Sequence, residues 1–226
     1  QTPSASGPRW TIAAAIARNV PRSGRWPPTH PPMPHTGRRI ACSPMSPRSH
    51  GTGRFSPDEL AELGAGTVLE EDVLVFNPAH VRIGANVYVG HRAMLKGDTR
   101  GELVLEDGVW VGQDCYLQSA GGIRIGARTG IGPRVTILTS VHEETPWPAP
   151  IIDAPLRFAP VEVGPGCDIG INATLLPGAR LGSGVQVGAG AVVVGEVPDG
   201  AIVAGVPARV LRYRAGAPAA DAEARC

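Results

Sequence analysis

The sequence predicts an all-β protein built as a parallel β-helix, and two features support this prediction. The first is a set of aliphatic residues that recur six positions apart. The second is that glycine directly follows many of them, as at Gly84, Gly90 and Gly112, where a chain can turn tightly. An α-helix repeats every 3.6 residues and a strand every two, so a period of six indicates short extended segments joined by corners. The aliphatic positions are Ile83, Val89, Leu95, Leu105, Val111, Leu117, Ile125, Ile131, Ile137, Val163, Ile169, Leu175, Leu181, Val187 and Val193.

Stacking of the coils explains why this spacing is stabilising. One coil cannot bury its aliphatic residue alone, whereas successive coils align these residues into a continuous column. Each buried aliphatic side chain contributes about 1.5 to 3 kcal/mol before chain entropy is subtracted. The step from Leu95 to Leu105 is ten residues and the step from Leu117 to Ile125 is eight. We therefore expect short insertions at those two corners.

Composition is consistent with one domain that has a core of small and β-branched residues. Of 226 residues, 30 are glycine, 23 are proline and only 4% are aromatic. The cysteines, Cys42, Cys115, Cys167 and Cys226, have no closely spaced pair, so we expect free thiols and a cytoplasmic location. No apolar stretch approaches the roughly 20 residues that cross a bilayer, so we expect no membrane insertion.

The N-terminal segment differs from the rest in charge and proline content. Residues 1–50 contain seven arginines, ten prolines and no acidic residue or lysine. We expect residues 1–55 to be disordered. A basic arm for nucleic acid and a transit peptide are both possible readings, but nothing patterned follows, and we expect no nucleic-acid partner.

Order is expected to begin at a short capping helix over residues 56–65. Ser56 suits the N-cap, Pro57 the first helical position and Glu59 the third position after the cap. Such a helix would cover the open end of the coils. We expect the β-helix to span 66–214, with a loop at 138–162 and a disordered tail at 215–226.

Three stretches resemble one protein family over about residues 66–214. The C-terminal one, from Val161 to Arg214, includes "VEVGPGCDIGINATLLPGARLGSGVQVGAGAVVVGEVPDG" and "GVPAR", and the upstream ones are "FNPAHVRIGANVYVG" and "GGIRIGARTGIGPRVTILTSVHEE". They are similar to the hexapeptide-repeat acyltransferases, especially galactoside, maltose and polysaccharide O-acetyltransferases. The resemblance implies a left-handed β-helix, a homotrimer, and transfer from acetyl-CoA at sites between neighbouring subunits.

We expect the catalytic residues to lie in the loop at 138–162. From Ile137 to Val163 is 26 residues, which is not a multiple of six, so the intervening chain must leave the column. It contains His142, whose imidazole, with an ordinary pKa of about 6.5, suits removal of a proton from an attacking hydroxyl. His142 also matches the catalytic base of the family. The alternative is a surface histidine. Glu144, or its neighbour Glu143, is a candidate for orienting the ring, although loop carboxylates are more often simply solvated.

A second wall of the site is expected at the corner before Ile125. Gln118 and Ser119 stand near the position where the resembling enzymes have an asparagine that contacts the acceptor hydroxyl. Gln118 is our candidate for this role. The alternative is that both are ordinary corner residues.

Acetyl-CoA contacts follow from the resemblance. Ala189, between Gly188 and Gly190, matches the small residue beside the pantetheine arm, and Arg209 and Arg212 match basic positions near the nucleotide. Arginine suits phosphate because its planar fork donates two hydrogen bonds. The alternative for the arginines is a solvent-facing edge.

Three positions depart from the family pattern. Asp168 replaces a tryptophan near the acceptor, and Val194 and Gly195 replace a threonine and a lysine. These departures put in question the wall of the acceptor pocket and the binding of the phosphates of acetyl-CoA.

The sequence therefore favours an acetyl-CoA-dependent O-acetyltransferase that acts on a sugar or polysaccharide. The alternatives are an N-acetyltransferase of a nucleotide-linked amino sugar and a non-catalytic trimeric scaffold. A zinc enzyme needs histidines close together, and His80 and His91 lie several coils before His142, so we expect no metal.

Overall fold

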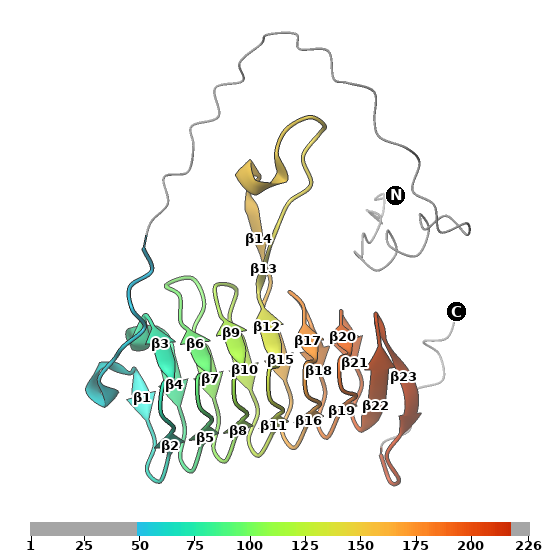
Figure 1. Ribbon diagram of the computed structural model, residues 1–226. Helices are drawn as coiled ribbons and strands as arrows, with labels where there is room; N and C mark the ends of the chain where they lie inside the picture. The colour runs from blue at the N-terminus through green and yellow to red at the C-terminus, as the bar shows by residue number, and fades with distance from the viewer. Residues whose placement is uncertain (1–48, 218–226) are drawn as a thin grey trace, which may run out of the picture. The chain divides into compact units, whose positions relative to one another are not determined.

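A computed structural model describes residues 49–217. Residues 1–48 and 218–226 lie outside the described residues. The expected disorder of these two segments and the expected free thiols of Cys42 and Cys226 therefore lie outside them too. Residues 49–217 form a parallel β-helix, as predicted, in which the chain winds through three sheets in turn (Figure 1). The fold is that of the left-handed β-helices.

Each coil except the last contributes one strand to each of three sheets, which we name A, B and C, and the strands in them are parallel apart from a C-terminal hairpin. Sheet A contains β1 (Glu62–Leu63), β4 (Val81–Ile83), β7 (Leu103–Leu105), β10 (Ile123–Ile125), β15 (Val161–Val163), β18 (Arg180–Leu181) and β21 (Glu196–Val197). Sheet B contains β2 (Val68–Leu69), β5 (Tyr88–Val89), β8 (Trp110–Val111), β11 (Gly130–Ile131), β16 (Asp168–Ile169), β19 (Gln186–Val187), β22 (Ala201–Gly205) and β23 (Ala208–Tyr213). Sheet C contains β3 (Leu74–Phe76), β6 (Met94–Lys96), β9 (Tyr116–Gln118), β12 (Thr136–Leu138), β17 (Thr174–Leu175) and β20 (Val192–Val193). The coils therefore have three edges, at which A meets B, B meets C, and C meets A.

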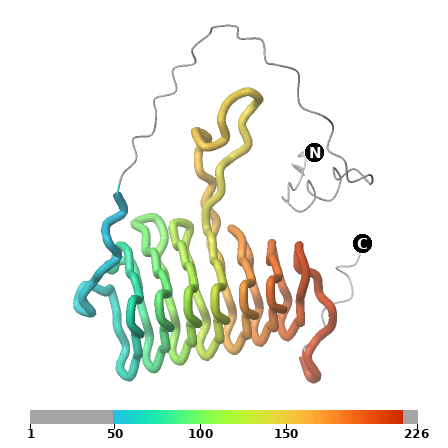
Figure 2. The backbone as a smooth tube through the Cα atoms, viewed as in Figure 1, coloured from blue at the N-terminus to red at the C-terminus, as the bar shows by residue number. Residues whose placement is uncertain are grey.

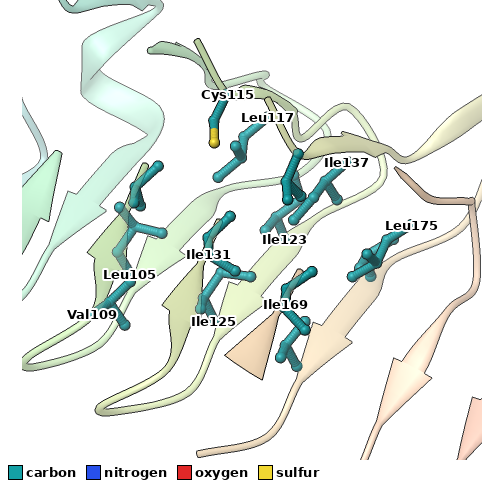
Figure 3. Packing of buried hydrophobic residues seen from close by; sticks show 14 of the residues in the cluster. Leu105, Val109, Cys115, Leu117, Ile123, Ile125, Ile131, Ile137, Ile169 and Leu175 are labelled. Carbon is teal, nitrogen blue, oxygen red and sulfur yellow. The ribbon is translucent and has the colours of Figure 1, made fainter. Parts of the chain in front are cut away.

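The aliphatic residues at the six-residue spacing form the core, and this prediction is confirmed. Every one of them is at most 4% exposed. Equivalent residues pair in adjacent coils, as Leu105 does with Ile125 in sheet A and Val111 with Ile131 in sheet B. Figure 3 shows Leu105, Ile125 and Ile131 among the buried side chains of the interior.

A second set of inward residues lies two positions before many of the aliphatic ones. All of them are buried; most are small or β-branched, whereas in sheet A the position is also held by Leu103 and Ile123. Cys115 and Cys167 belong to this set and are free thiols, as expected. Burial raises the pKa of the Cys115 thiol to about 11. Further members are Val87, Ala93, Val109, Val135, Ala173, Ala179, Val185 and Ala191.

The expected helix over 56–65 is wrong in length. It is a single 3₁₀ turn, η1 (Pro57–Glu59), in which the Ser56 N–H donates to Glu59 Oε2 at 2.6 Å. The chain then becomes extended at Leu60, because Ala61 N–H bonds to the Val81 carbonyl and draws the backbone into sheet A. The coils therefore begin at β1, before residue 66.

Residues 49–55, placed in the disordered segment by the sequence, include positions that contact the first coil. The Gly53 carbonyl accepts a hydrogen bond from Val75 N–H, and Phe55 packs against the core. A further 3₁₀ turn, η2 (Pro78–His80), forms the first corner between sheets C and A. At the other end, β23 folds back antiparallel on β22.

The expected loop at 138–162 is an arm whose bounds are narrower, at 139–160. Leu138 belongs to β12, and Val161 and Glu162 belong to β15. The arm leaves at the edge between sheets C and A, and Figure 2 shows it extending away from the coils. Its stem is an antiparallel ladder of β13 (Ser140–His142) and β14 (Leu156–Phe158), and its outer part contains η3 (Ile151–Asp153).

Candidate active site

The base of the arm is held by hydrogen bonds from the coil below it. The side chain of Thr139 is fully buried, and its hydroxyl donates to the Gln118 backbone carbonyl at 2.7 Å and accepts from Gly121 N–H at 2.8 Å. Gln118 Oε1 accepts from Thr139 N–H, and its amide donates to the Ser140 hydroxyl, both at 3.2 Å. These bonds fix the direction in which the arm leaves the body.

Close packing also holds the base of the arm in place. A Cβ on Gly121 would lie 2.6 Å from the Thr139 carbonyl oxygen and 2.9 Å from Ala159 backbone atoms, so only glycine fits there. On the adjacent insertion, the Arg100 guanidinium lies 4.9 Å from the centre of the Phe158 ring in β14. The insertions expected after Leu95 and Leu117 are therefore next to the arm and support it.

His142 lies on β13 and is half-buried, with its ring held by the arm itself. Its Nδ1 is 3.1 Å from the carbonyl oxygen of Ala154, a buried residue near the far end of η3. A carbonyl only accepts, so Nδ1 carries a hydrogen, and in the neutral ring the lone pair is then on Nε2. A ring held in this tautomer is suited to accept a proton at Nε2.

Within the described residues Glu144 does not contact Nδ1 of His142, and its orienting role stays a prediction. The partner there is a backbone carbonyl, and the side chains of Glu143 and Glu144 are exposed on the arm. Sequence reasoning missed Ala154, because a backbone carbonyl twelve residues away leaves no residue-type signal.

Gln118 and Ser119 have structural contacts in the described residues. Gln118 supports the arm, as described above. The Ser119 hydroxyl is completely buried, 3.0 Å from the Lys96 carbonyl oxygen and 2.8 Å from that of Gly101. It therefore holds the insertion after Leu95 rather than facing solvent. Gln118 thus contacts the base of the arm, and its role in the reaction stays a prediction.

The predicted cofactor residues occupy the edge between sheets B and C and the last hairpin. Gly188, Ala189 and Gly190 form the corner between β19 and β20. The N–H groups of Gly188 and Gly190 bond to backbone carbonyls of adjacent coils, whereas that of Ala189 has no hydrogen-bond acceptor within residues 49–217. Ala189 is exposed, so its N–H can donate to a ligand.

Arg209 and Arg212 lie on β23, on the outward face of sheet B. They pair with Ala204 and Ile202, which alternate with the buried Ala201 and Val203. Both arginines are exposed. The guanidinium of Arg212 can therefore meet an anion in solution.

One protomer does not bring these predicted residues together. His142 stands on an arm at the edge between C and A, whereas Ala189 lies at the edge between B and C. Within residues 49–217, no group of three His, Cys, Asp or Glu side chains is placed to hold a metal ion. No helix in the same range has the length and apolar character needed to span a bilayer.

Comparison with known proteins agrees with this architecture. No family model matches the sequence. The chain is 32% identical over 143 residues to the putative lipopolysaccharide biosynthesis O-acetyl transferase WbbJ of Escherichia coli K12, covering 60% of this chain and 73% of that protein. It is 31% identical to the putative colanic acid biosynthesis acetyltransferase WcaF of the same organism, covering 59% of this chain and 69% of that protein.

A solved structure shows the same fold. The N-acyltransferase AntD from Bacillus cereus, in complex with dTDP-4-amino-4,6-dideoxyglucose and coenzyme A, superposes with a TM-score of 0.62 at 20% identity. The match covers 69% of this chain and 84% of that one. The curated relatives and this fold together define a β-helix acyltransferase. The chain belongs to the hexapeptide-repeat acyltransferase family, as its resemblance implied.

Proposed function

We propose that this protein transfers the acetyl group of acetyl-CoA to a hydroxyl of a sugar or polysaccharide, with His142 as the general base. The observation that carries the proposal is the hydrogen bond from His142 Nδ1 to the Ala154 carbonyl, which leaves Nε2 as a proton acceptor. The relatives WbbJ and WcaF, named for lipopolysaccharide and colanic acid biosynthesis, support a saccharide acceptor.

The reaction follows from these groups. Nε2 takes the proton of the acceptor hydroxyl as its oxygen attacks the thioester carbonyl. The tetrahedral intermediate collapses, the C–S bond breaks, and the thiolate of coenzyme A takes the proton back from the imidazolium. The products are an acetyl ester and free coenzyme A, and the histidine returns to its neutral tautomer.

Two regions of the chain support binding of acetyl-CoA. The exposed N–H of Ala189 can donate to an amide carbonyl of the pantetheine arm. Arg212 and Arg209 can pair with phosphate oxygens. Because Ala189 and His142 lie at different edges of one protomer, we propose a homotrimer in which neighbouring subunits complete each site. The exposed apolar residues of the arm, Trp147, Ile151 and Ile152, suit contact with such a neighbour.

A second candidate is N-acetylation of a nucleotide-linked amino sugar. The fold match to AntD, solved with such a ligand, favours it. An amine would then replace the hydroxyl as nucleophile, with the same base.

A thiol-release assay with acetyl-CoA tests both candidates. The acceptor panel contains neutral sugars, oligosaccharides, amino sugars and nucleotide-linked amino sugars. We expect coenzyme A release with a hydroxyl acceptor, and loss of that release in His142→Ala. Release with amino sugars alone would replace the first candidate by the second.

A further inference from the structure

The two ends of the β-helix carry opposite charge. Residues 56–72, which lead from η1 through β1 and β2, contain six acidic residues and no basic one, and we name them the acidic end. Residues 200–217, which include β22 and β23, contain three arginines and no acidic residue, and we name them the basic end. The acidic residues are Asp58, Glu59, Glu62, Glu70, Glu71 and Asp72, and the arginines are Arg209, Arg212 and Arg214. The two ends are therefore complementary in charge.

Each end also presents an edge strand of sheet B. β2 is the first strand of this sheet and pairs with β5, whereas β23 is the last and pairs with β22 (Figure 1). Within residues 49–217, neither strand has a partner on its outer side. An edge strand presents backbone N–H and C=O groups that can pair with another chain. Sheet B can therefore be extended at both ends.

The two ends also hold most of the exposed large apolar side chains that lie outside the arm. They are Leu63 and Val68 at the acidic end and Val206, Val210 and Leu211 at the basic end. Val68 is 48% exposed and Leu211 is 67% exposed. Elsewhere in the described coils, only Trp110 and Ile171 are of this kind. Contact between the ends of two copies would remove this apolar surface from water.

Charge decides which ends can meet. Two acidic ends, or two basic ends, would bring like charges together, whereas an acidic end attracts a basic end. In a stack with sheet B continuous, β23 of one copy lies antiparallel to β2 of the next. Arg209 pairs with Ala204 close to the edge between sheets B and C, and Glu71 follows β2 at the same edge. The stack therefore brings Arg209 close to Glu71 of the next copy.

We propose that the acidic end of one copy binds the basic end of another, so that copies of this chain associate head to tail along the coil axis. Because β2 has only two residues, few backbone hydrogen bonds form, and charge pairing and apolar contact supply most of the affinity. A head-to-tail contact along one axis does not close on itself, so rods form whose length grows with concentration. The homotrimer proposed above is a separate contact, since it joins subunits side by side at the arm.

Mass photometry and sedimentation velocity of the full chain test this proposal over a range of concentration and salt. We expect the mean mass to rise with concentration in multiples of the smallest species. It should fall at high salt, because exposed charges are then screened. Glu71→Arg and Arg209→Glu should each weaken the association about tenfold. The double variant should associate again, because its charges are exchanged between the two ends.

The apolar part of the contact has its own test. Leu211→Ser should weaken the association while every charge stays in place. Two control variants lie in the middle of the coils and should associate like the wild type. Ile171→Ser changes an exposed apolar residue, and Arg128→Glu reverses an exposed arginine at the corner between β10 and β11. Thermal unfolding followed by circular dichroism shows that each variant is folded.

Several outcomes would overturn the proposal. One is a mean mass that does not change with concentration, and another is growth that salt does not affect. A loss in Arg209→Glu that Glu71→Arg does not reverse also overturns it. Loss of growth in Trp147→Ser but not in Leu211→Ser would assign the contact to the arm instead. Acetyl transfer is measured separately, and transfer by a wild type that forms no rods would leave the proposed function standing.

Discussion

The imidazole Nδ1 of His142 lies 3.1 Å from the carbonyl oxygen of Ala154, across the stem of the arm. This bond links the candidate base to the outer part of the arm. The orientation of the ring therefore depends on how the arm folds on itself, and a backbone group selects the tautomer. The following predictions start from this relationship and move outward to the coils.

Replacing His142 by alanine should lower acetyl transfer about 10² to 10⁴-fold, the usual contribution of a general base. The fold should be unchanged, because the ring is only half-buried on the arm. The measurement is the initial rate of thiol release, with circular dichroism as the structural check. His91→Ala is the control, since the His91 side chain is partly exposed on the coils, 3.6 Å from Glu70. Equal rates in the two variants would exclude His142 as the base.

Gln118→Ala should loosen the arm at its base. Thr139 N–H loses its acceptor, and an unsatisfied group of this kind costs about 1 to 3 kcal/mol. We expect faster hydrogen exchange over residues 139–160, and a fall in kcat that exceeds any change in the affinity for coenzyme A. Gln186→Ala, an exposed glutamine on sheet B, serves as the control. Unchanged exchange in the arm would show that Gln118 does not position it.

Arg212→Ala should weaken the binding of coenzyme A roughly fivefold, about 1 kcal/mol for an exposed charge contact. The effect should shrink as salt is raised, because exposed charges are screened. Calorimetry at two ionic strengths measures both. Arg180→Ala, whose partner Glu162 lies on sheet A, should leave affinity unchanged. A salt-independent loss, or none, would remove Arg212 from the phosphate site.

Ile131→Asp should unfold the coils, since the position is completely buried and an unpaired charge there costs several kcal/mol. Ile131→Val, which removes one methylene, should cost about 0.5 to 1.5 kcal/mol. Thermal unfolding followed by circular dichroism distinguishes the two. A melting temperature for Ile131→Asp equal to that of the wild type would contradict the buried column.

Cys115 should make stability depend on alkaline pH. Burial raises the pKa of its thiol from 9.0 to about 11, so the folded state holds the proton more tightly than the unfolded state. Its contribution is complete below pH 9 and is lost as pH rises toward 11, by up to about 3 kcal/mol. Urea unfolding at pH 8 and pH 10.5 measures the loss. In Cys115→Ala the decline should be smaller, and an identical decline would show that this thiol does not contribute.

The buried core is the part of the fold that the sequence predicts most clearly. Ile131 and Ile137 could be assigned to the interior from the six-residue period. This period arises because each side of a coil consists of one short strand and one corner of the same length. The excursion of the chain after Ile137 could be predicted for the same reason, since 26 residues do not fit the period. Its shape could not, because the pairing of β13 with β14 is a choice within the arm and has no periodic signature.

The helix expected at 56–65 does not continue beyond one turn, for a physical reason. Local signals at Ser56, Pro57 and Glu59 do start a helical turn, but the hydrogen bond from Ala61 N–H to the Val81 carbonyl competes with its continuation. A bond between residues twenty positions apart cannot be inferred from capping residues.

The amino-acid order alone determined that this chain is a coiled β solenoid with an interruption that carries His142, because burial of aliphatic residues at a constant period leaves no other arrangement. Only the tertiary structure decided which groups meet: Ala154 with the imidazole, Gln118 with the base of the arm, and Trp110 with Tyr88 of the preceding coil. These contacts join residues on different strands and coils. Several of their partners are backbone atoms, for which residue identity carries no signal.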